Sequence, residues 1–250
     1  MGSGLAVRAE TRGRGSNMAQ PNTAAGSAAF ITLEGVDGAG KSTQARLLAR
    51  ALELAGREVV ALREPGGTVI SEKIRSLLLD PENAAMGDTC ELLLYEAARA
   101  QLVHEVIAPA LAAGKIVVCD RFYDSTTCYQ AFADGLDRKV VHGANNLAVA
   151  GTHPDLTLVY QIEPALAVRR LNARAGTDRM EAKGMAFQER VYQGFAAIAA
   201  EEPGRVKLID ASEDIAHVFR RTVVEVCAAG VEISDDAARE ALADVMLEAE

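Results

Sequence analysis

FITLEGVDGAGKST, residues 30–43, is the stretch of sequence that decides the fold. Its second half matches the pattern G-x-x-x-x-G-K-[ST], in which backbone amides surround phosphate groups. Glycines at positions 35, 38 and 40 permit backbone angles that other residues avoid, so the loop can wrap around an anion. The stretch therefore predicts a strand, a phosphate-binding loop (P-loop) and a helix in succession.

The P-loop supplies the groups that a nucleoside triphosphate requires. Lys41 is expected to reach the β- and γ-phosphates, and the Ser42 hydroxyl to ligate the Mg²⁺ that accompanies the nucleotide. The helix that follows would add its positive end. The predicted nucleotide-binding residues are Gly35, Val36, Asp37, Gly38, Ala39, Gly40, Lys41, Ser42 and Thr43. The alternative is a glycine-rich turn that binds no ligand.

Composition narrows the range of partners and cellular settings. The chain has 250 residues and a formal net charge of −9, which argues against duplex nucleic acid as its main partner. Its four cysteines are irregularly spaced without a C-x-x-C pair, so we expect reduced thiols in a cytoplasmic protein. No apolar run approaches the roughly 18 residues that span a bilayer, so we expect no membrane partner.

Short apolar runs alternate with alanine- and leucine-rich stretches along most of the chain. This alternation predicts an α/β fold with a five-stranded parallel sheet flanked by helices. We expect strands near residues 30–34, 57–63, 115–120, 155–162 and 205–210. We expect helices near residues 41–55, 68–79, 88–113, 138–150, 164–175, 185–201 and 212–228, the last one starting at Ser212.

Both ends of the chain differ from this pattern. Residues 1–29 lack the apolar segment of a secretory signal, and we interpret them as a disordered N-terminal extension rather than a transit peptide. Residues 30–228 form the predicted P-loop domain. Residues 229–250 are rich in Asp and Glu, and we expect an acidic tail, helical or frayed, outside the catalytic core.

Two of the predicted strands end in charged residues. Arg63 ends the second strand and Asp120-Arg121 end the third, so all should lie at the same edge of the sheet as the P-loop. The two arginines are expected to bind phosphate, and Asp120 to hold Mg²⁺ or its waters. Taken alone, a surface Arg63–Glu64 pair and a structural Asp120–Arg121 pair would be the simpler interpretations.

Tyr95 and Arg99 lie four residues apart on one predicted helix and therefore share a face. An aromatic plate beside a planar donor suits a flat heterocyclic base, which needs stacking and hydrogen bonds to its edge. The simpler alternative is a Tyr in the core and an Arg at the surface.

Over about residues 30–228 the chain resembles thymidylate kinase, of the bacterial type with lid arginines. The resemblance rests on Arg63-Glu64-Pro65-Gly66-Gly67-Thr68, Tyr95-Glu96-Ala97-Ala98-Arg99, Asp120-Arg121-Phe122 with Ser125-Thr126 and Tyr129-Gln130, and Asp178-Arg179-Met180-Glu181. It implies a fold like that of nucleoside-monophosphate kinases and transfer of the γ-phosphoryl group of ATP to dTMP with Mg²⁺, giving dTDP and ADP for dTTP synthesis. It also implies a homodimer, with contacts through the helices near residues 88–113 and 138–150.

The resemblance also implies a role for individual residues. Tyr95 would stack on the thymine base, Arg99 and Thr126 would read its edge, and Tyr129 would crowd the position of a ribose 2′-hydroxyl. Asp37 would face the sugar and the reacting phosphate, and the arginines of the two strand ends would bind the phosphate of dTMP. The implied substrate-binding residues are Asp37, Arg63, Tyr95, Arg99, Arg121, Thr126, Tyr129 and Gln130.

Five basic residues from Arg169 to Lys183 interrupt the otherwise acidic chain, and we expect a mobile lid over about residues 169–184. Some family members carry an arginine in the P-loop where this chain has Gly38, and others, chiefly bacterial, supply that cation from the lid. Because phosphoryl transfer requires neutralised equatorial oxygens, a lid arginine is the expected catalytic group, Arg174 first and Arg170 second. The alternative is a solvated basic helix end. The predicted catalytic residues are Lys41, Arg174, Arg170, Arg121 and Asp37.

Two rival functions remain open from the sequence. Another nucleoside or nucleoside-monophosphate kinase would share the P-loop, but residues 63–68 and 95–99 argue against it. A nucleotide-dependent switch without an acceptor substrate is the second rival. A GTP switch would need an N-K-x-D run, which the sequence lacks.

Overall fold

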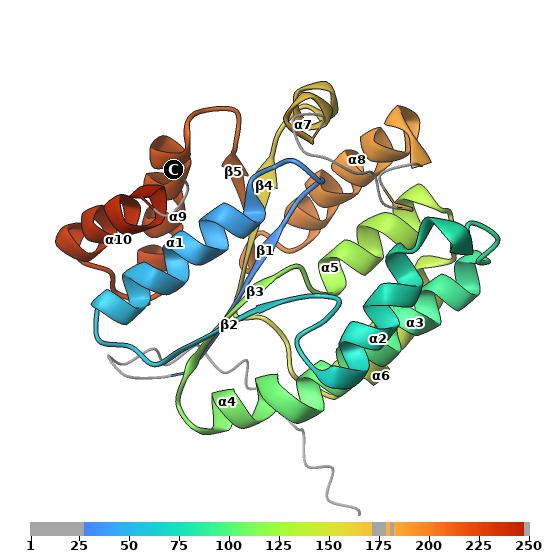
Figure 1. Ribbon diagram of the computed structural model, residues 1–250, viewed down its shortest axis with the longest axis horizontal. Helices are drawn as coiled ribbons and strands as arrows, with labels where there is room; N and C mark the ends of the chain where they lie inside the picture. Colours follow the sequence, from blue (N-terminus) through green and yellow to red (C-terminus); the bar gives the residue numbers. More distant parts are fainter. Residues whose placement is uncertain (1–27, 172–178, 181–182, 248–250) are drawn as a thin grey trace, which may run out of the picture.

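The computed structural model describes residues 28–171, 179–180 and 183–247. Its centre is a parallel sheet of five strands in the order β2-β3-β1-β4-β5 (Figure 1). The strands are β1 (Ala29–Glu34), β2 (Val59–Arg63), β3 (Ile116–Asp120), β4 (Leu156–Gln161) and β5 (Val206–Asp210). The predicted α/β fold and its five parallel strands are confirmed.

The middle strand explains why the sheet could be read from the sequence. All six residues of β1 are buried, and Ile31 lies opposite Val118 of β3 on one side and Leu156 of β4 on the other. A parallel strand that is covered on both faces does not alternate apolar with polar residues, so its sequence is a nearly continuous apolar run.

Helices cover both faces of the sheet (Figure 1). They are α1 (Lys41–Leu54), α2 (Val69–Leu79), α3 (Asp88–Leu102), α4 (Ala108–Ala112), α5 (Tyr123–Thr126), α6 (Arg138–Val149), α7 (Pro164–Leu171), α8 (Met185–Glu201), α9 (Ile215–Ala228) and α10 (Asp235–Leu247). The connection from β1 to β2 runs in the opposite direction across the sheet to the later ones. Because such crossovers are right-handed, α1 lies on one face and α2 to α8 on the other. Helices α9 and α10, which follow the last strand, pack against α1 and so cover its face.

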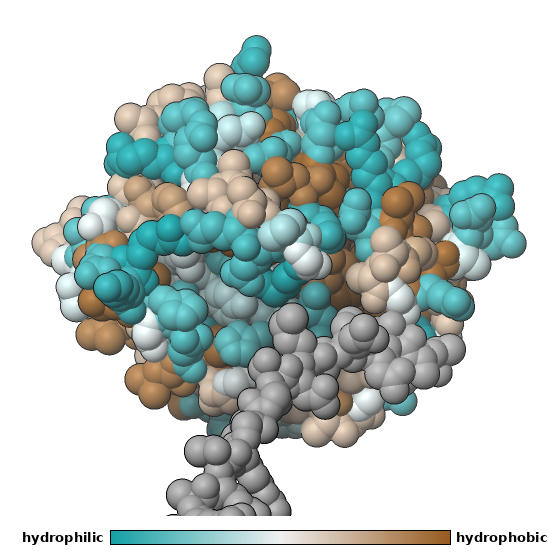
Figure 2. Space-filling view, turned by 180° about the vertical axis from the view of Figure 1, so that it is seen from behind, coloured by the Kyte–Doolittle hydropathy of each residue, from teal (hydrophilic) through white to brown (hydrophobic). Residues whose placement is uncertain are grey.

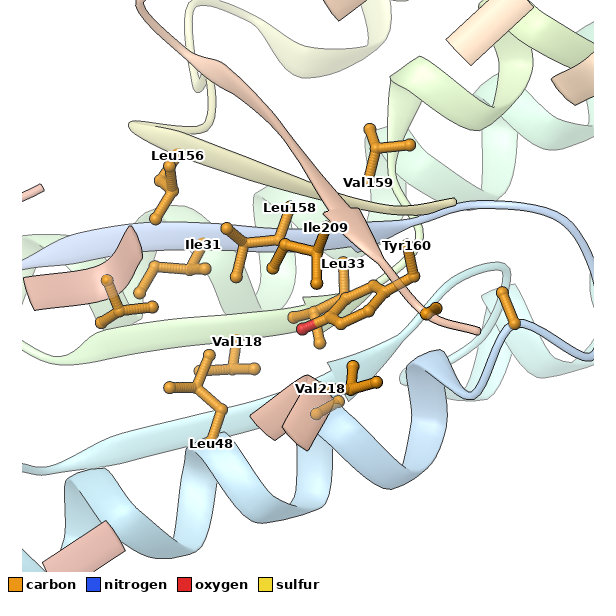
Figure 3. Close-up of a cluster of buried hydrophobic side chains, with 14 of the residues drawn as sticks. Ile31, Leu33, Leu48, Val118, Leu156, Leu158, Val159, Tyr160, Ile209 and Val218 are labelled. Atoms are coloured by element: carbon orange, nitrogen blue, oxygen red, sulfur yellow. The ribbon is translucent and has the colours of Figure 1, made fainter. Parts of the chain in front are cut away.

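The largest cluster of buried apolar side chains includes the layer between the sheet and helices α1 and α9 (Figure 3). Leu48 of α1 and Val218 of α9 point toward side chains of the sheet, among them Val118 and Tyr160 (Figure 3). The Tyr160 hydroxyl, fully surrounded by protein, is hydrogen-bonded to Thr222 of α9 at 2.8 Å. Burial of this layer fixes α1, and with it the P-loop, relative to the strand ends.

The opposite face contains two helical turns that are wider than α-helical ones. The predicted helix over residues 88–113 is one run in which Val103–Ile107 forms a π-helical turn between α3 and α4. A second π-helical segment, Thr127–Ala133, continues from α5, and Asp134 donates its amide hydrogen bond to the Tyr129 carbonyl at 2.9 Å. No helix was predicted over residues 123–133, because this segment shows no clear helical periodicity.

The region after β5 requires two corrections. The helix predicted to start at Ser212 starts at Ile215, because the Asp214 side chain accepts the His217 amide at 2.8 Å and caps it. The acidic stretch 229–250, expected to be helical or frayed, contains helix α10, but this helix packs along α1 instead of lying outside the core. Its residues Ala237, Ala241 and Val245 lie four apart, share a face, and are buried in the core.

The surface seen from behind is a mosaic of hydrophilic and hydrophobic side chains (Figure 2). Within the residues that the structure describes, no helix is both long and apolar enough to cross a membrane. The predicted segment 1–29 lies outside the described residues except for its last two positions.

Candidate active site

The P-loop connects the buried end of β1 to the first turn of α1. Gly35 has a φ of 136°, and a Cβ there would lie 2.6 Å from the Tyr160 carbonyl oxygen, so only glycine fits. Gly40 precedes α1 with a φ of 91°, and no side chain caps the helix. The first amides of α1 are therefore offered to an anion in the cleft.

Lys41 lies at the base of this loop and is 6% exposed. Its ammonium donates a hydrogen bond to the Val36 carbonyl at 2.8 Å and lies 4.0 Å from the Asp37 carboxylate. Burial and the neighbouring Arg121 guanidinium lower the pKa of Lys41 to about 8. The geometry aims a poorly solvated cation at the loop, where a phosphate would restore its charged form.

Arg121 joins the P-loop to the segment after β3. Its guanidinium pairs with the Asp37 carboxylate and donates to the Gly35 carbonyl at 3.1 Å, the Ser125 hydroxyl at 2.9 Å and the Tyr129 hydroxyl at 3.2 Å. Burial would raise the pKa of Asp37, but Arg121 and Lys41 outweigh it and hold the pKa below its usual value. Asp37, Arg121 and Tyr129 thus form one hydrogen-bonded cluster beside the P-loop.

Glu34 was missed by the sequence reasoning, although it precedes the P-loop directly. It is fully buried and accepts hydrogen bonds from the Phe122 amide at 2.7 Å and the Ser125 hydroxyl at 2.6 Å. Burial and the nearby Asp124 raise the pKa of Glu34 to about 7. These bonds hold the backbone around Arg121, which has an unusual positive φ of 74°.

Asp120 and Ser42, the two residues predicted to hold Mg²⁺, lie next to each other at the N-terminus of α1. The Ser42 hydroxyl donates to one carboxylate oxygen of Asp120 at 2.5 Å. The other oxygen, Oδ1, is buried and has no hydrogen-bond partner among the described residues, so it is suited to a cation or its water. The described residues contain no group of three or more Asp, Glu, His or Cys side chains that could hold a metal ion by themselves. A Mg²⁺ here would therefore take most of its ligands from phosphates and water, as this ion prefers.

A cleft of about 920 Å³ runs along the P-loop. Its lining includes Arg63, which ends the edge strand β2, and Ile215, which follows the opposite edge strand β5, so these two mark its two ends. Leu242 lines it as well. Arg63 is half exposed and pairs with Glu72 at 3.0 Å, so the simpler interpretation, an Arg63–Glu64 pair, is wrong. Arg75 lines the cleft and donates a hydrogen bond to the Pro65 carbonyl at 2.9 Å. The sequence reasoning missed it, because an arginine within a helix has no sequence pattern that marks it as a binding residue.

A smaller pocket of about 100 Å³ adjoins the cleft. It brings together the residues predicted to bind the acceptor, which are Asp37, Tyr95, Arg99, Arg121, Thr126, Tyr129 and Gln130. Arg63 lines only the large cleft, whereas Asp37, Arg121, Arg75 and Glu64 line both. Burial raises the pKa of Tyr95 well above its usual value, so its ring stays neutral and available for stacking.

Arg99 is the most heavily bonded side chain of the pocket, with every N–H group engaged. It makes a forked pair with Glu64, the shorter contact being 2.8 Å, and pairs with Glu96 of its own helix. It also donates to Asn145 at 3.2 Å and to the Thr126 hydroxyl at 2.9 Å. The alternative of a surface Arg at this position is wrong, because Arg99 is 1% exposed.

Comparison with known proteins places this site in a family. Residues 33–222 match the family model described as thymidylate kinase. The chain belongs to the thymidylate kinase family. The thymidylate kinase of Trichlorobacter lovleyi is 48% identical over 195 residues, which cover 76% of this chain and 92% of that protein. The thymidylate kinase of Solidesulfovibrio magneticus is 48% identical over 190 residues, which cover 73% of this chain and 91% of that protein.

A solved structure agrees with the sequence comparison. The crystal structure of thymidylate kinase from Ehrlichia chaffeensis superposes with a TM-score of 0.65 at 33% identity, covering 80% of this chain and 99% of that chain. The fold is therefore that of the thymidylate kinases. As a member of this family the chain is a kinase that phosphorylates dTMP with ATP in dTTP synthesis.

Two basic residues of the predicted lid, Arg179 and Lys183, form ion pairs with acidic side chains. Arg179 contacts the buried Glu91 carboxylate at 2.5 Å and donates to the Leu78 carbonyl at 2.8 Å. Lys183 contacts Glu91 at 3.2 Å and Asp134 at 2.9 Å. The side-chain amide of Gln130 also donates to Glu91 at 2.8 Å. Glu91, which the sequence reasoning missed, therefore connects the lid residues to the small pocket.

Of the two lid arginines predicted to be catalytic, the structure describes Arg170 but not Arg174. Arg170 of α7 lines the cleft, and its guanidinium donates to the Ala211 carbonyl at 3.0 Å and to the Ser212 carbonyl at 3.2 Å. Arg174, the first choice for the catalytic cation, lies outside the described residues.

Proposed function

We propose that the chain transfers the γ-phosphoryl group of ATP to dTMP at the junction of the cleft and the small pocket, giving dTDP and ADP. The observation that carries this proposal is that Asp37 and Arg121 line both cavities. A nucleotide whose base fills the pocket would have its phosphate beside the P-loop, where a second nucleotide presents its own. Placing the two phosphates side by side is the main task of a phosphoryl-transfer enzyme.

The charges at the junction suit the reaction. Lys41 and Arg121 would neutralise oxygens of the transferred group, and Arg63 at the cleft wall would bind the phosphate of dTMP. Asp37, held ionised by its two cationic neighbours, would orient the sugar and the acceptor phosphate. Arg174 or Arg170 would add a cation as the transition state forms.

We also propose Mg²⁺ as the cofactor, held by Ser42 and the unpartnered oxygen of Asp120. When bound, Mg²⁺ supplies charge neutralisation between the β- and γ-phosphates of ATP.

The small pocket would select thymine by shape and by fixed dipoles. Tyr95 would stack on the base, and Tyr129 would crowd the sugar. Since the N–H groups of Arg99 are engaged by the protein, Arg99 would act on the base edge through Thr126. The Thr126 oxygen accepts from Arg99, and its own O–H then donates to a thymine carbonyl.

A homodimer in the cytoplasm completes the proposal. Val140 and Leu147 of α6 lie seven residues apart on one face and are 57% and 83% exposed, and Leu93 of α3 is 60% exposed. Such an apolar face on α3 and α6 suits the dimer contact that the family resemblance implies. Light scattering should give twice the chain mass, and Leu147→Glu should lower it; a monomeric parent would contradict the dimer.

A substrate panel tests the reaction. ADP release would be measured with dTMP, dUMP, dCMP, dGMP and AMP at fixed ATP and Mg²⁺, with and without chelator. We expect the highest kcat/KM for dTMP and none without Mg²⁺. A preference for another acceptor would favour a different nucleoside-monophosphate kinase, and slow ATP turnover unchanged by any acceptor would favour a switch.

A further inference from the structure

Helix α10 lies outside residues 33–222, which carry the family match, yet it is built into the core beside the P-loop helix. Ala241 is fully buried, and Asp244 of α10 pairs with Arg50 of α1 at 2.8 Å. The Ser234 hydroxyl accepts the Ala237 amide at 3.2 Å at the start of the helix. The position of α10 against α1 is therefore fixed by packing and by polar contacts.

One residue of α10 also reaches the active-site cleft. Leu242 follows Ala241 on the helix, is half-buried, and lines the cleft together with Ile215 and Val218 of α9. Gln44 of α1 donates to the Ile215 carbonyl at 3.1 Å, which ties the start of α9 to the P-loop helix. Ile215, Val218 and Leu242 thus form an apolar wall in this part of the cleft, next to Glu213 and Asp214.

The two ends of the cleft can be assigned to the two nucleotides. The acceptor pocket with Tyr95 and Arg99 adjoins the end that carries Arg63. Because both phosphate chains must meet at the P-loop, the base of the phosphoryl donor has to point the opposite way. That direction leads along Ala211 and Ile215 to Leu242. An apolar wall suits the face of a purine.

We propose that α10 forms part of the donor site, and that Leu242 contacts the purine base of the bound nucleotide. Leu242 is then a specificity residue for the donor, supplied by a helix that the family match does not include. The proposal rests on ATP as the donor but not on which acceptor is phosphorylated.

Ligands with and without a base test the proposal. Dissociation constants for ADP and for inorganic tripolyphosphate would be measured by calorimetry on the full chain, for the parent and for Leu242→Ala. Loss of an apolar contact should weaken ADP binding about fivefold to tenfold, whereas tripolyphosphate binding should stay within twofold. Leu247→Ala is the matched control, because Leu247 lies on the same helix and is 72% exposed, and it should change neither value.

Two results would overturn the proposal. Equal weakening of ADP and tripolyphosphate would mean that Leu242 acts by supporting α1, and no weakening of either would mean that it does not contact the ligand. Leu242→Met, which keeps the apolar bulk, should restore ADP binding.

A measurement on the parent protein covers the case in which Leu242→Ala fails to fold. Hydrogen exchange in residues 235–247 should slow with saturating ADP but not with saturating tripolyphosphate. Equal protection by the two ligands would contradict the base contact.

Discussion

The phosphate end of the active site and the base pocket are built from the same residue types in opposite proportion. At the phosphate end one carboxylate, Asp37, is shared by two cations, Lys41 and Arg121. In the base pocket two carboxylates, Glu64 and Glu96, are shared by one cation, Arg99. Among these side chains, cations outnumber carboxylates at the phosphate end, and carboxylates outnumber cations in the base pocket.

The difference corresponds to the charge of what each end binds. A phosphate brings negative charge, so an excess of poorly solvated cations gains from its arrival. Thymine is neutral, so its pocket needs dipoles in fixed directions and no net attraction for anions. The buried Arg99, with all its N–H groups hydrogen-bonded, holds such dipoles in place. Its burial removes three charges from water, those of Arg99, Glu64 and Glu96, and this is tolerated only because the charges are paired.

The largest expected effect comes from the phosphate end. Lys41→Ala should lower the single-turnover rate by at least about 10³-fold. It removes a positive charge that stabilises the transferred phosphoryl group most strongly in the transition state. The unfolding midpoint should change little or rise, since a buried cation is removed. Exposed Lys139 serves as a control through Lys139→Ala. A folded Lys41→Ala protein with normal kcat would exclude the P-loop as the catalytic site.

The lid arginines should separate into chemical and structural groups. Arg174→Ala should lower kcat by about 10³-fold with little change in the KM for dTMP, as for an arginine that acts in the transition state. Arg174→Lys should restore little, because a point charge does not replace a planar fork.

Arg179→Ala should instead lower the free energy of unfolding, by about 3 kcal/mol or more, since it leaves Glu91 buried beside one cation fewer. Single-turnover rates and denaturation curves for Arg170→Ala, Arg174→Ala and Arg179→Ala decide. If all three keep rates within about tenfold of the parent, Arg121 becomes the leading candidate for the catalytic arginine.

Arg99 and Arg63 give the sharpest test of the contrast between the two ends. Arg99→Ala should lower the free energy of unfolding by about 3–5 kcal/mol, because Glu64 and Glu96 remain buried and unpaired, and kcat/KM for dTMP by about 10²-fold. Arg63→Ala should cost less than about 0.5 kcal/mol, since its pair with Glu72 is exposed, while raising the KM for dTMP about tenfold. Denaturation and steady-state kinetics give both numbers. Greater destabilisation by Arg63→Ala would reverse the contrast.

The smallest expected effect is a pH dependence of donor binding. Burial disfavours the Lys41 ammonium, so the group loses its proton near pH 8 in the free enzyme, well below a solvated lysine. The neutral amine attracts phosphate poorly, so kcat/KM for ATP should fall about tenfold per unit above pH 8 and be level just below it. Bound ATP raises the pKa again, so kcat should stay level to higher pH. Lys41→Arg should remove the alkaline fall, and a parent profile without any fall up to about pH 10 would contradict the assignment.

The sequence predicted the sheet and the P-loop well because both follow from local patterns. Apolar runs such as residues 30–34 and 116–120 can only be buried strands in a parallel sheet, and the loop pattern fixes its own backbone. Tyr95 and Arg99 were placed side by side by their spacing, and the structure brings both to one pocket.

Partners distant in sequence were not predictable in the same way. No local sequence pattern predicts that Glu64 pairs with Arg99 rather than with Arg63. The same is true of the ion pairs that Glu91 forms with Arg179 and Lys183, because the burial of a carboxylate depends on the whole fold. Asp235, Asp236 and Glu240 of α10 are exposed, and such acidic residues concealed the apolar stripe that faces α1, so a packed helix was placed outside the core.

The π-helical segment Thr127–Ala133 has a consequence for how this protein tolerates changes in length. A π-helical turn holds one residue more than an α-helical turn, so deleting one residue there would leave a regular α-helix that is still well formed. The flanking helix would keep its orientation, but side chains within the segment would shift by up to about 100° around the helix axis, each toward the place of its neighbour. Thr126 and Tyr129 could then no longer face the same pocket as Arg121. We expect single-residue deletions to be accepted in the loops around this segment and rejected within it, a pattern that a deletion library scored for growth would show.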